Sequence, residues 1–235
     1  MSKSNKVIKP KKKTIVVYTD GSCSGNGRSN AVGGIGIHFP NGELKDVSKI
    51  YNLGLCTNQK TELYAILTAL RYIKQNFGLS GYKVYIKTDS EYSINCITKW
   101  VYGWIKNGWL TKNNTPVVNK ELIEIINKYY ETYHIELIHV AAHTNGDDED
   151  SVANAVADRL ATRATDRAQL ERKKNGYVEK NHNKKSTRKK PGSKTSHKKS
   201  SSNKSSKYSG RKSYVNPSRF PSTANFIVEL VKSNK

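Results

Sequence analysis

The first clear apolar pattern of this chain is the run of β-branched residues at 15–17, which is typical of a strand buried on both faces. The run leads into Asp20, and three glycines stand within the seven residues that follow. A carboxylate at the end of a buried strand has a rigid backbone and little water around it, which suits a metal ligand. The alternative is that Asp20 only begins a turn, as Asp before Gly often does.

The next segments predict two more strands and a helix. Strands are expected at 32–39 and 44–53, because Pro-Asn-Gly at 40–42 is a hairpin signal between them. Apolar residues then recur with the spacing of a helix that packs on a sheet: Leu63, Ile66, Leu67, Leu70 and Ile73. Glu62 stands one residue before this stripe, where its carboxylate can reach a sheet edge.

A second strand that ends in an acid is expected at 82–89. Polar and apolar residues alternate there, and Thr-Asp closes the segment at Asp89 as it does at Asp20. Ser90 then opens a short helix that leads into a tryptophan-rich segment, 100–109, with lysines in and beside it. The two strand-terminal acids are therefore candidates for one shared site.

The remaining pattern completes a mixed α/β domain. Asn-Asn-Thr-Pro at 113–116 breaks the chain before a helix with three apolar positions, Leu122, Ile125 and Ile126. A fifth strand is expected at 135–140 and a closing helix at 153–164. Strands and helices in this order predict one domain over residues 14–165.

Charge divides the chain into three parts. Residues 1–13 carry six lysines and no acid, residues 14–165 carry 15 Lys and Arg against 15 Asp and Glu, and residues 166–235 carry 20 against 4. We expect a basic disordered arm, a neutral domain, and a disordered Lys/Ser-rich tail with a short apolar segment near 220–231. Nucleic acid, bound non-specifically, is the expected partner of both flanks; no apolar run is long enough to span a bilayer, so no membrane is expected.

The cysteines bear on the compartment. Cys23, Cys56 and Cys96 are odd in number and have no C-x-x-C spacing, so they are expected to be free thiols in a reducing compartment, the cytoplasm or the nucleus. The basic tail is compatible with a nuclear signal. We expect the protein to be a monomer.

Five segments together resemble the type 1 ribonucleases H. They are YTDGSCSGNGR, TNQKTEL, KTDSEYSINCITKW, HVAAH and NAVADRLA, and they occur in the family's order and spacing across residues 14–165. WVYGWIKNGW followed by VVNKEL resembles the basic protrusion of the cellular, eukaryotic-type enzymes. The resemblance implies a ribonuclease H-like α/β fold: a mixed five-stranded sheet, three strands antiparallel and two parallel, flanked by helices.

The resemblance also implies an activity and a metal site. The activity is endoribonucleolytic hydrolysis of the RNA strand of RNA·DNA hybrids, leaving 5′-phosphate and 3′-hydroxyl ends. The implied ligands of two Mg²⁺ ions, or Mn²⁺, are Asp20, Glu62, Asp89 and Asp158. Four acids in one pocket repel strongly unless divalent cations neutralise them, and oxygen-only ligands suit these two metals.

His143 matches a mobile histidine that the family uses in proton transfer or product departure. Without the family resemblance, a lone loop histidine is more often a solvated surface residue. The interval to Asp158 is longer than usual in the family because of an acidic run at 147–150. Such a run is usually a solvated loop, but beside a metal site it could attract Mg²⁺ or repel substrate phosphate.

A further set of residues is implied to bind the hybrid. By resemblance, amide side chains read the minor groove and its ribose 2′-hydroxyls, aromatic rings line the DNA channel, and a small pocket grips a DNA phosphate. The minor-groove residues are Asn26, Asn58 and Gln59. The rings of the DNA channel are Tyr92 and Trp100, and the phosphate pocket includes Thr57 and Asn119. For the rings the alternative is helix core, which we favour for Trp104. Leu55 stands where the family pattern has Arg, so the phosphate pocket has lost its charge.

Two other functions compete with this one. The same fold serves integrases and junction resolvases, but the Thr-Asn-Gln segment at 57–59 and the tryptophan protrusion speak against them. A non-catalytic nucleic-acid binder would use the basic flanks alone. The four intact acids speak against that alternative.

Overall fold

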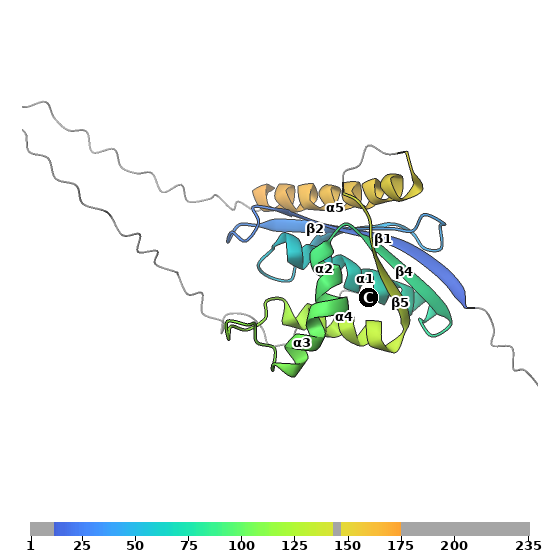
Figure 1. The fold of residues 1–235 in the computed structure, drawn as a ribbon. Coiled ribbons are helices and arrows are strands. Elements are labelled where there is room, and N and C mark those ends of the chain that lie inside the picture. The colour runs from blue at the N-terminus through green and yellow to red at the C-terminus, as the bar shows by residue number, and fades with distance from the viewer. Residues whose placement is uncertain (1–11, 143–146, 175–235) are drawn as a thin grey trace, which may run out of the picture. The chain divides into compact units, whose positions relative to one another are not determined.

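The computed structural model describes residues 12–142 and 147–174, and the predictions that fall on 1–11, 143–146 and 175–235 lie outside the described residues. A five-stranded sheet with the order β3-β2-β1-β4-β5 forms the centre (Figure 1). Its strands are β1 Lys13–Ser24, β2 Val32–His38, β3 Val47–Tyr51, β4 Tyr82–Thr88 and β5 His134–His139. The pairs β1–β2 and β2–β3 are antiparallel, while β1–β4 and β4–β5 are parallel. The predicted mixed α/β fold is confirmed.

Strand β1 does not end at Asp20, as the sequence suggested. It continues to Ser24, because the residues after Asp20 stay extended and pair with β2 through Ser24↔Val32. Its parallel pairing with β4, however, stops at Tyr18↔Lys87. Asp20 therefore lies just past the parallel ladder, where β1 has a neighbour on one side only.

The helices divide between the two faces of the sheet (Figure 1). Helices α1 and α4 lie on one side, and α5 lies on the other. All five residues of the predicted apolar stripe in α1 are fully buried, whereas in α4 Ile123 is buried and Ile125 is not. The helices are α1 Asn58–Phe77, α2 Glu91–Asn95, the π-helical turn η1 Cys96–Trp100, α3 Val101–Lys106, α4 Lys120–Thr132 and α5 Glu149–Lys174.

Helix α5 is longer than the sequence pattern predicted. It runs past Thr165, the expected end of the domain, to Lys174, and Ala168 beyond that point is buried. The guanidinium of Arg167 donates to the backbone oxygen of Ser48 in β3 at 2.6 Å. The helix end, rather than Thr165, thus closes the described domain.

Two glycines of β2 let α5 approach the sheet closely. A Cβ built on Gly36 would lie 1.9 Å from the backbone oxygen of Ala157, and one on Gly34 would lie 2.3 Å from the Cβ of Ala164. Gly36 is also the cross-strand partner of Asp20. The closest approach of α5 is therefore beside the strand position of this acid.

We expect Gly36→Ala to destabilise the protein by about 1–3 kcal/mol or more, because the added methyl must push the α5 backbone away. Gly81→Ala is the matched control, since a Cβ added there would meet nothing within 4 Å and the backbone at this position is unstrained. Chemical denaturation of both variants measures the difference. Equal stabilities would show that α5 does not rest on Gly36.

Candidate active site

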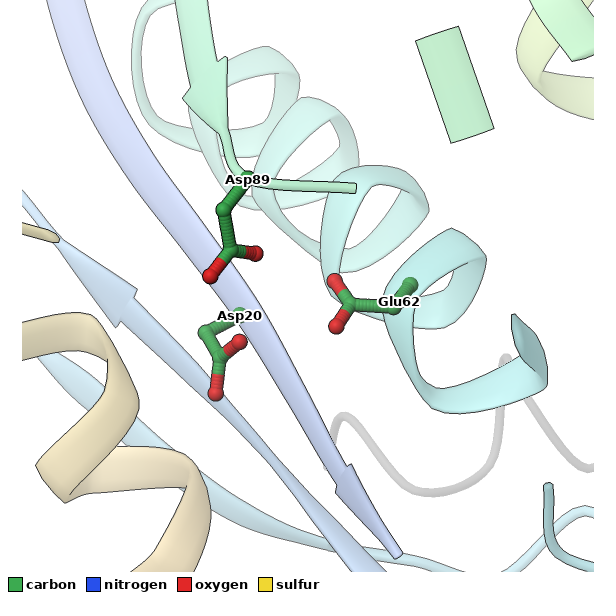
Figure 2. Close-up of side chains that lie close together, drawn as sticks. All are labelled: Asp20, Glu62 and Asp89. Atoms are coloured by element: carbon green, nitrogen blue, oxygen red, sulfur yellow. The ribbon is translucent and has the colours of Figure 1, made fainter. Parts of the chain in front are cut away.

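Three carboxylates from three separate elements converge at one edge of the sheet. Asp20 lies in β1, Glu62 in the second turn of α1, and Asp89 directly after β4. One oxygen from each lies within 4.8 Å of the other two. In Figure 2 the three side chains point toward one another. Sequence spacing alone placed Glu62 at the flank of a helix, and the structure puts it within α1.

A close contact between β1 and α1 brings Glu62 to the site. A Cβ on Gly21 would lie 2.2 Å from the backbone nitrogen of Glu62, so only glycine allows this approach. The helix begins nearby, where Thr57 accepts a hydrogen bond from the backbone N–H of Lys60 at 3.2 Å. The capped first turn and the glycine contact together fix the direction of the Glu62 side chain.

The electrostatics of the cluster oppose full ionisation. Burial first, and then the charges of Asp20 and Asp89, raise the pKa of Glu62 well above its ordinary value. Its Oε2 atom is buried and has no hydrogen-bond partner in the described part of the chain. An unpartnered carboxylate oxygen that faces two further acids fits a divalent cation with oxygen ligands, such as Mg²⁺ or Mn²⁺.

Asp158, the fourth expected acid, is half-buried on α5 and is not among the three carboxylates that meet within 4.8 Å. It directly follows Ala157, whose backbone oxygen lies over Gly36, the partner of Asp20 across the ladder. The fold therefore brings its helix beside the cluster. His143 lies outside the described residues.

Two acids of the run at 147–150 have partners that sequence reasoning missed. Asp148 Oδ1 accepts the backbone N–H of Ser151 at 3.0 Å, which caps the start of α5. Asp150 forms an ion pair with Lys87 and accepts a hydrogen bond from the Tyr18 hydroxyl at 2.6 Å. An Asp just before a helical segment is the usual signal of a cap. The contacts of Asp150 could not be predicted from the local sequence, because its partners Lys87 and Tyr18 are far from it in the chain.

The residues expected to read the minor groove lie together. The backbone N–H of Asn58 donates to Asn26 Oδ1 at 3.1 Å, and that of Gly27 donates to the Cys56 carbonyl at 3.0 Å. These bonds hold the loop after β1 against the start of α1. Asn26, Asn58 and Gln59 are all exposed, and of the Asn26 amide the oxygen is engaged by the Asn58 backbone.

Three of the other expected contacts, Tyr92, Trp100 and Asn119, lie in or beside η1, whereas Thr57 caps α1. The side-chain nitrogen of Asn119 donates to the Tyr92 hydroxyl at 3.1 Å, while its Oδ1 atom is buried and unpartnered within the described residues. Trp100 is 43% exposed and lies edge-on to Tyr92, with ring centroids 6.1 Å apart. Trp104 is only half-buried and packs edge-on against Trp100, so the expectation that it is core was wrong. Its ring partner is Trp100, which belongs to the same tryptophan-rich segment. Leu55 is 40% exposed.

Two further expectations concern the chain as a whole. All three cysteines are free, as expected. Within the described residues, no helix combines the length and the apolar character that a bilayer crossing requires.

Comparison with known proteins gives a family match. The sequence pattern of the family described as RNase H matches residues 12–166. A probable ribonuclease H from Acanthamoeba polyphaga mimivirus is 53% identical over 149 residues, which are 63% of this chain and 65% of that protein. Ribonuclease H1 from Rattus norvegicus is 40% identical over 149 residues, 63% of this chain and 49% of that protein. The chain thus spans about half to two thirds of these relatives.

A shorter relative and a solved structure agree with this match. Ribonuclease H from Clostridium botulinum (strain Hall) is 36% identical over 156 residues, 66% of this chain and 97% of that protein. The crystal structure of LC9-RNase H1, described as a type 1 RNase H with the type 2 active-site motif, has a TM-score of 0.51 and 25% identity. That likeness covers 68% of this chain and 75% of the other.

The raised pKa of Glu62 predicts how stability depends on pH in metal-free buffer. Between the ordinary glutamate pKa and the raised value, the folded state holds the proton that the unfolded chain has released, so the free energy of unfolding falls as pH rises. Glu62→Gln has no carboxyl group to ionise, so its free energy of unfolding does not fall with pH for this reason. We expect the variant to be the more stable protein near neutral pH, with the difference closing below the ordinary glutamate pKa.

Urea denaturation with a chelator at several pH values measures this effect. Glu171→Gln is the control, because Glu171 lies on α5, remote in sequence from the three acids and outside the cluster. A Glu62→Gln protein that is less stable than the native one near neutral pH would contradict the account of the cluster.

Proposed function

The chain belongs to the RNase H family, and from that premise we propose that it is an endoribonuclease that hydrolyses the RNA strand of RNA·DNA hybrids. The observation that carries the proposal is the convergence of Asp20, Glu62 and Asp89, with the buried Glu62 oxygen unpartnered among the described residues. Burial and the charges of Asp20 and Asp89 raise the pKa of Glu62, so the three acids are held together at a cost, which a cation-dependent reaction explains and a purely structural role does not.

The proposed metal ligands are these three acids and Asp158, which together would hold two Mg²⁺ ions or Mn²⁺. When bound, such a pair activates the attacking water and stabilises the departing 3′ oxygen, so that the products carry 5′-phosphate and 3′-hydroxyl ends. The protein's part is to keep the ligands still. Asp20 and Asp89 extend from hydrogen-bonded strands, and Glu62 extends from a capped helix in contact with Gly21.

Proton transfer is proposed for His143. An imidazole whose pKa lies near neutrality can take a proton from the attacking water or give one to the leaving oxygen. It comes a few residues after the end of β5, the strand next to β4, and Asp89 directly follows β4.

Recognition of the hybrid is proposed for two groups of residues. The amides of Asn26, Asn58 and Gln59 would contact ribose 2′-hydroxyls, which distinguish RNA from DNA. On the DNA strand, Tyr92 and Trp100 would line the channel, and Thr57 with Asn119 would hold a phosphate. Leu55 supplies no charge to that phosphate pocket, so discrimination of the DNA strand would be weaker than with Arg.

The flanks are proposed to bind nucleic acid without reading its sequence. Residues 1–13 and 166–235 hold the excess positive charge, and cationic side chains gain affinity by releasing counterions condensed on the phosphates. We retain the proposed division into arm, catalytic domain and tail, with the catalytic domain extended to the end of α5. A monomer in a reducing compartment is proposed as well.

We expect Asp20→Asn, Glu62→Gln and Asp89→Asn each to abolish cleavage, because each removes a metal ligand while the fold persists. The measurement is cleavage of an end-labelled RNA·DNA hybrid with and without Mg²⁺, with circular dichroism as the test of folding. Asp166→Asn is the control, since Asp166 is exposed on α5. Appreciable cleavage by Asp20→Asn would contradict the metal mechanism.

The same assay separates the competing functions. A junction resolvase or integrase would cut branched or duplex DNA in preference to the hybrid. A binder without activity would retain the hybrid and leave it intact in the presence of Mg²⁺.

A chain shortened to end at Lys174 tests the tail. We expect it to keep its cleavage chemistry, to bind the hybrid more weakly, and to show a shallower dependence of affinity on salt, because fewer counterions are released. Fluorescence anisotropy at several salt concentrations, compared with the full chain, measures the slope. An unchanged affinity and slope would rule out a role of the tail in binding.

A further inference from the structure

The interface between α5 and the sheet is tight but smooth. Small side chains of the helix, Ala157, Ala161 and Ala164, face the two glycines of β2, Gly34 and Gly36. Small residues on both sides allow close contact but offer few knobs that would prevent a helix from sliding or rotating. Asp158 belongs to this helix, so its position depends on whatever fixes the helix on the sheet.

Polar contacts fix α5 at each end of this interface. At the far end, Thr165 Oγ1 donates to the Ser22 carbonyl at 3.3 Å, and Arg167 donates to the Ser48 carbonyl. At the near end, Asp150 forms an ion pair with Lys87 and accepts the Tyr18 hydroxyl bond. The Lys87 ammonium also donates to the Tyr18 hydroxyl at 3.2 Å. All three members of the near-end contact therefore touch one another.

The near-end contact is partly shielded from water. Tyr18 is 1% exposed and packs with Val140, Ala153 and Ala157, while the Lys87 side chain is 20% exposed. Asp150 is more open, with its side chain 43% exposed, so the charge pair alone would be weak. The buried hydroxyl gives the carboxylate a fixed direction that a surface pair lacks.

The strand residues of this contact are directly linked to the acids of the active site. Tyr18 stands two residues before Asp20, and Lys87 stands two residues before Asp89. Tyr18 and Asp20 both belong to β1 and therefore share a face of that strand, while Asp89 directly follows β4. Tyr18 and Lys87 are also cross-strand partners, and they form the last pair of the β1–β4 ladder. Asp150 thus contacts both β1 and β4 close to the proposed metal ligands, Asp20 and Asp89.

On the helix side, Asp150 stands eight residues before Asp158 in α5, about 12 Å along the helix axis. A rotation of the helix by one residue would turn Asp158 by about 100° away from its place. We propose that Asp150, through Tyr18 and Lys87, is a positioning residue that sets the register of α5 on the sheet and so holds Asp158 at the metal site. The inference rests on the proposed function, because it takes Asp158 as a ligand.

The acidic run thereby acquires a role that its composition did not suggest. It neither forms a merely solvated loop nor serves to collect cations at Asp150, because that carboxylate is already engaged by a lysine and a tyrosine. Asp148 caps the helix and Asp150 sets its register. Both residues therefore fix the position of α5 as a whole.

The test is Mg²⁺ binding to the full chain by isothermal titration calorimetry, which needs no cleavage. We expect Asp150→Asn to weaken Mg²⁺ binding about tenfold, the lower end of what loss of an outer-sphere partner costs. Glu149→Gln is the matched control: it removes the same charge from the same turn of the helix, and Glu149 is exposed. Tyr18→Phe, which keeps the buried ring, should give a smaller loss in the same direction.

A double variant separates positioning from long-range charge. If Asp150 acts through Asp158, Asp150→Asn should cause no further loss of Mg²⁺ affinity in a protein that already carries Asp158→Asn. Additive losses, or equal effects of Asp150→Asn and Glu149→Gln, would overturn the inference. An Asp158→Asn protein with native Mg²⁺ affinity would overturn it together with the assignment of Asp158. If the Mg²⁺ affinities of the variants change as expected but the native protein does not cleave the hybrid, the proposed function alone is refuted.

Discussion

The repulsion among carboxylates at the end of the parallel ladder is the constraint on which the rest of this structure depends. Asp20, Glu62 and Asp89 come from three elements, and burial together with the charges of the two aspartates disfavours the ionised form of Glu62. They stay together because the backbone around them is fixed elsewhere, by the β1–β2 ladder, by the capped start of α1 and by the contact at Gly21. The free energy that opposes their meeting is then available to favour a bound cation.

The two faces of the sheet serve this cluster differently. On one face, α1 buries a continuous apolar stripe and places the Glu62 carboxylate in the cluster from its second turn. On the other, α5 lies on glycines and alanines, an interface that packs closely but specifies position weakly. Position on that face comes from polar groups along the contact: Asp150 near the start of the helix, the Leu160 carbonyl, which accepts from the Ser48 hydroxyl at 2.7 Å, and Thr165 and Arg167 farther along.

Sequence pattern predicted the elements whose periodicity is strong. The stripe from Leu63 to Ile73 and the alternation before Asp89 each have one dominant period, and packing does not override either one. The C-terminal turns of α5 could not be predicted in this way, because alanine buries little area and charged residues dominate the composition there. The extension of β1 past Asp20 was missed for a related reason: glycine suggests a turn, whereas here it allows close packing.

For the site, the sequence analysis named Asp20, Glu62 and Asp89, which the structure brings together, but it did not predict how they are held. Two strand ends with the same Thr-Asp signature were visible in the sequence. The meeting of Tyr18, Lys87 and Asp150 was not, because it joins residues far apart in the chain and only the folded sheet brings them together. The half-exposed Trp104 shows the same limit, since its packing partner is decided by the fold.

The continuity of β1 has a geometric consequence. The strand runs unbroken from Asp20 to Ser24 and leads directly into the loop that carries Asn26, so one stiff segment of about 13 Å separates the acid from the start of that loop. The loop is fastened in turn to the start of α1, the helix that supplies Glu62. The hydrogen-bonded strand therefore fixes the distance between Asp20 and the loop that carries Asn26. A ligand that contacts both must match this distance.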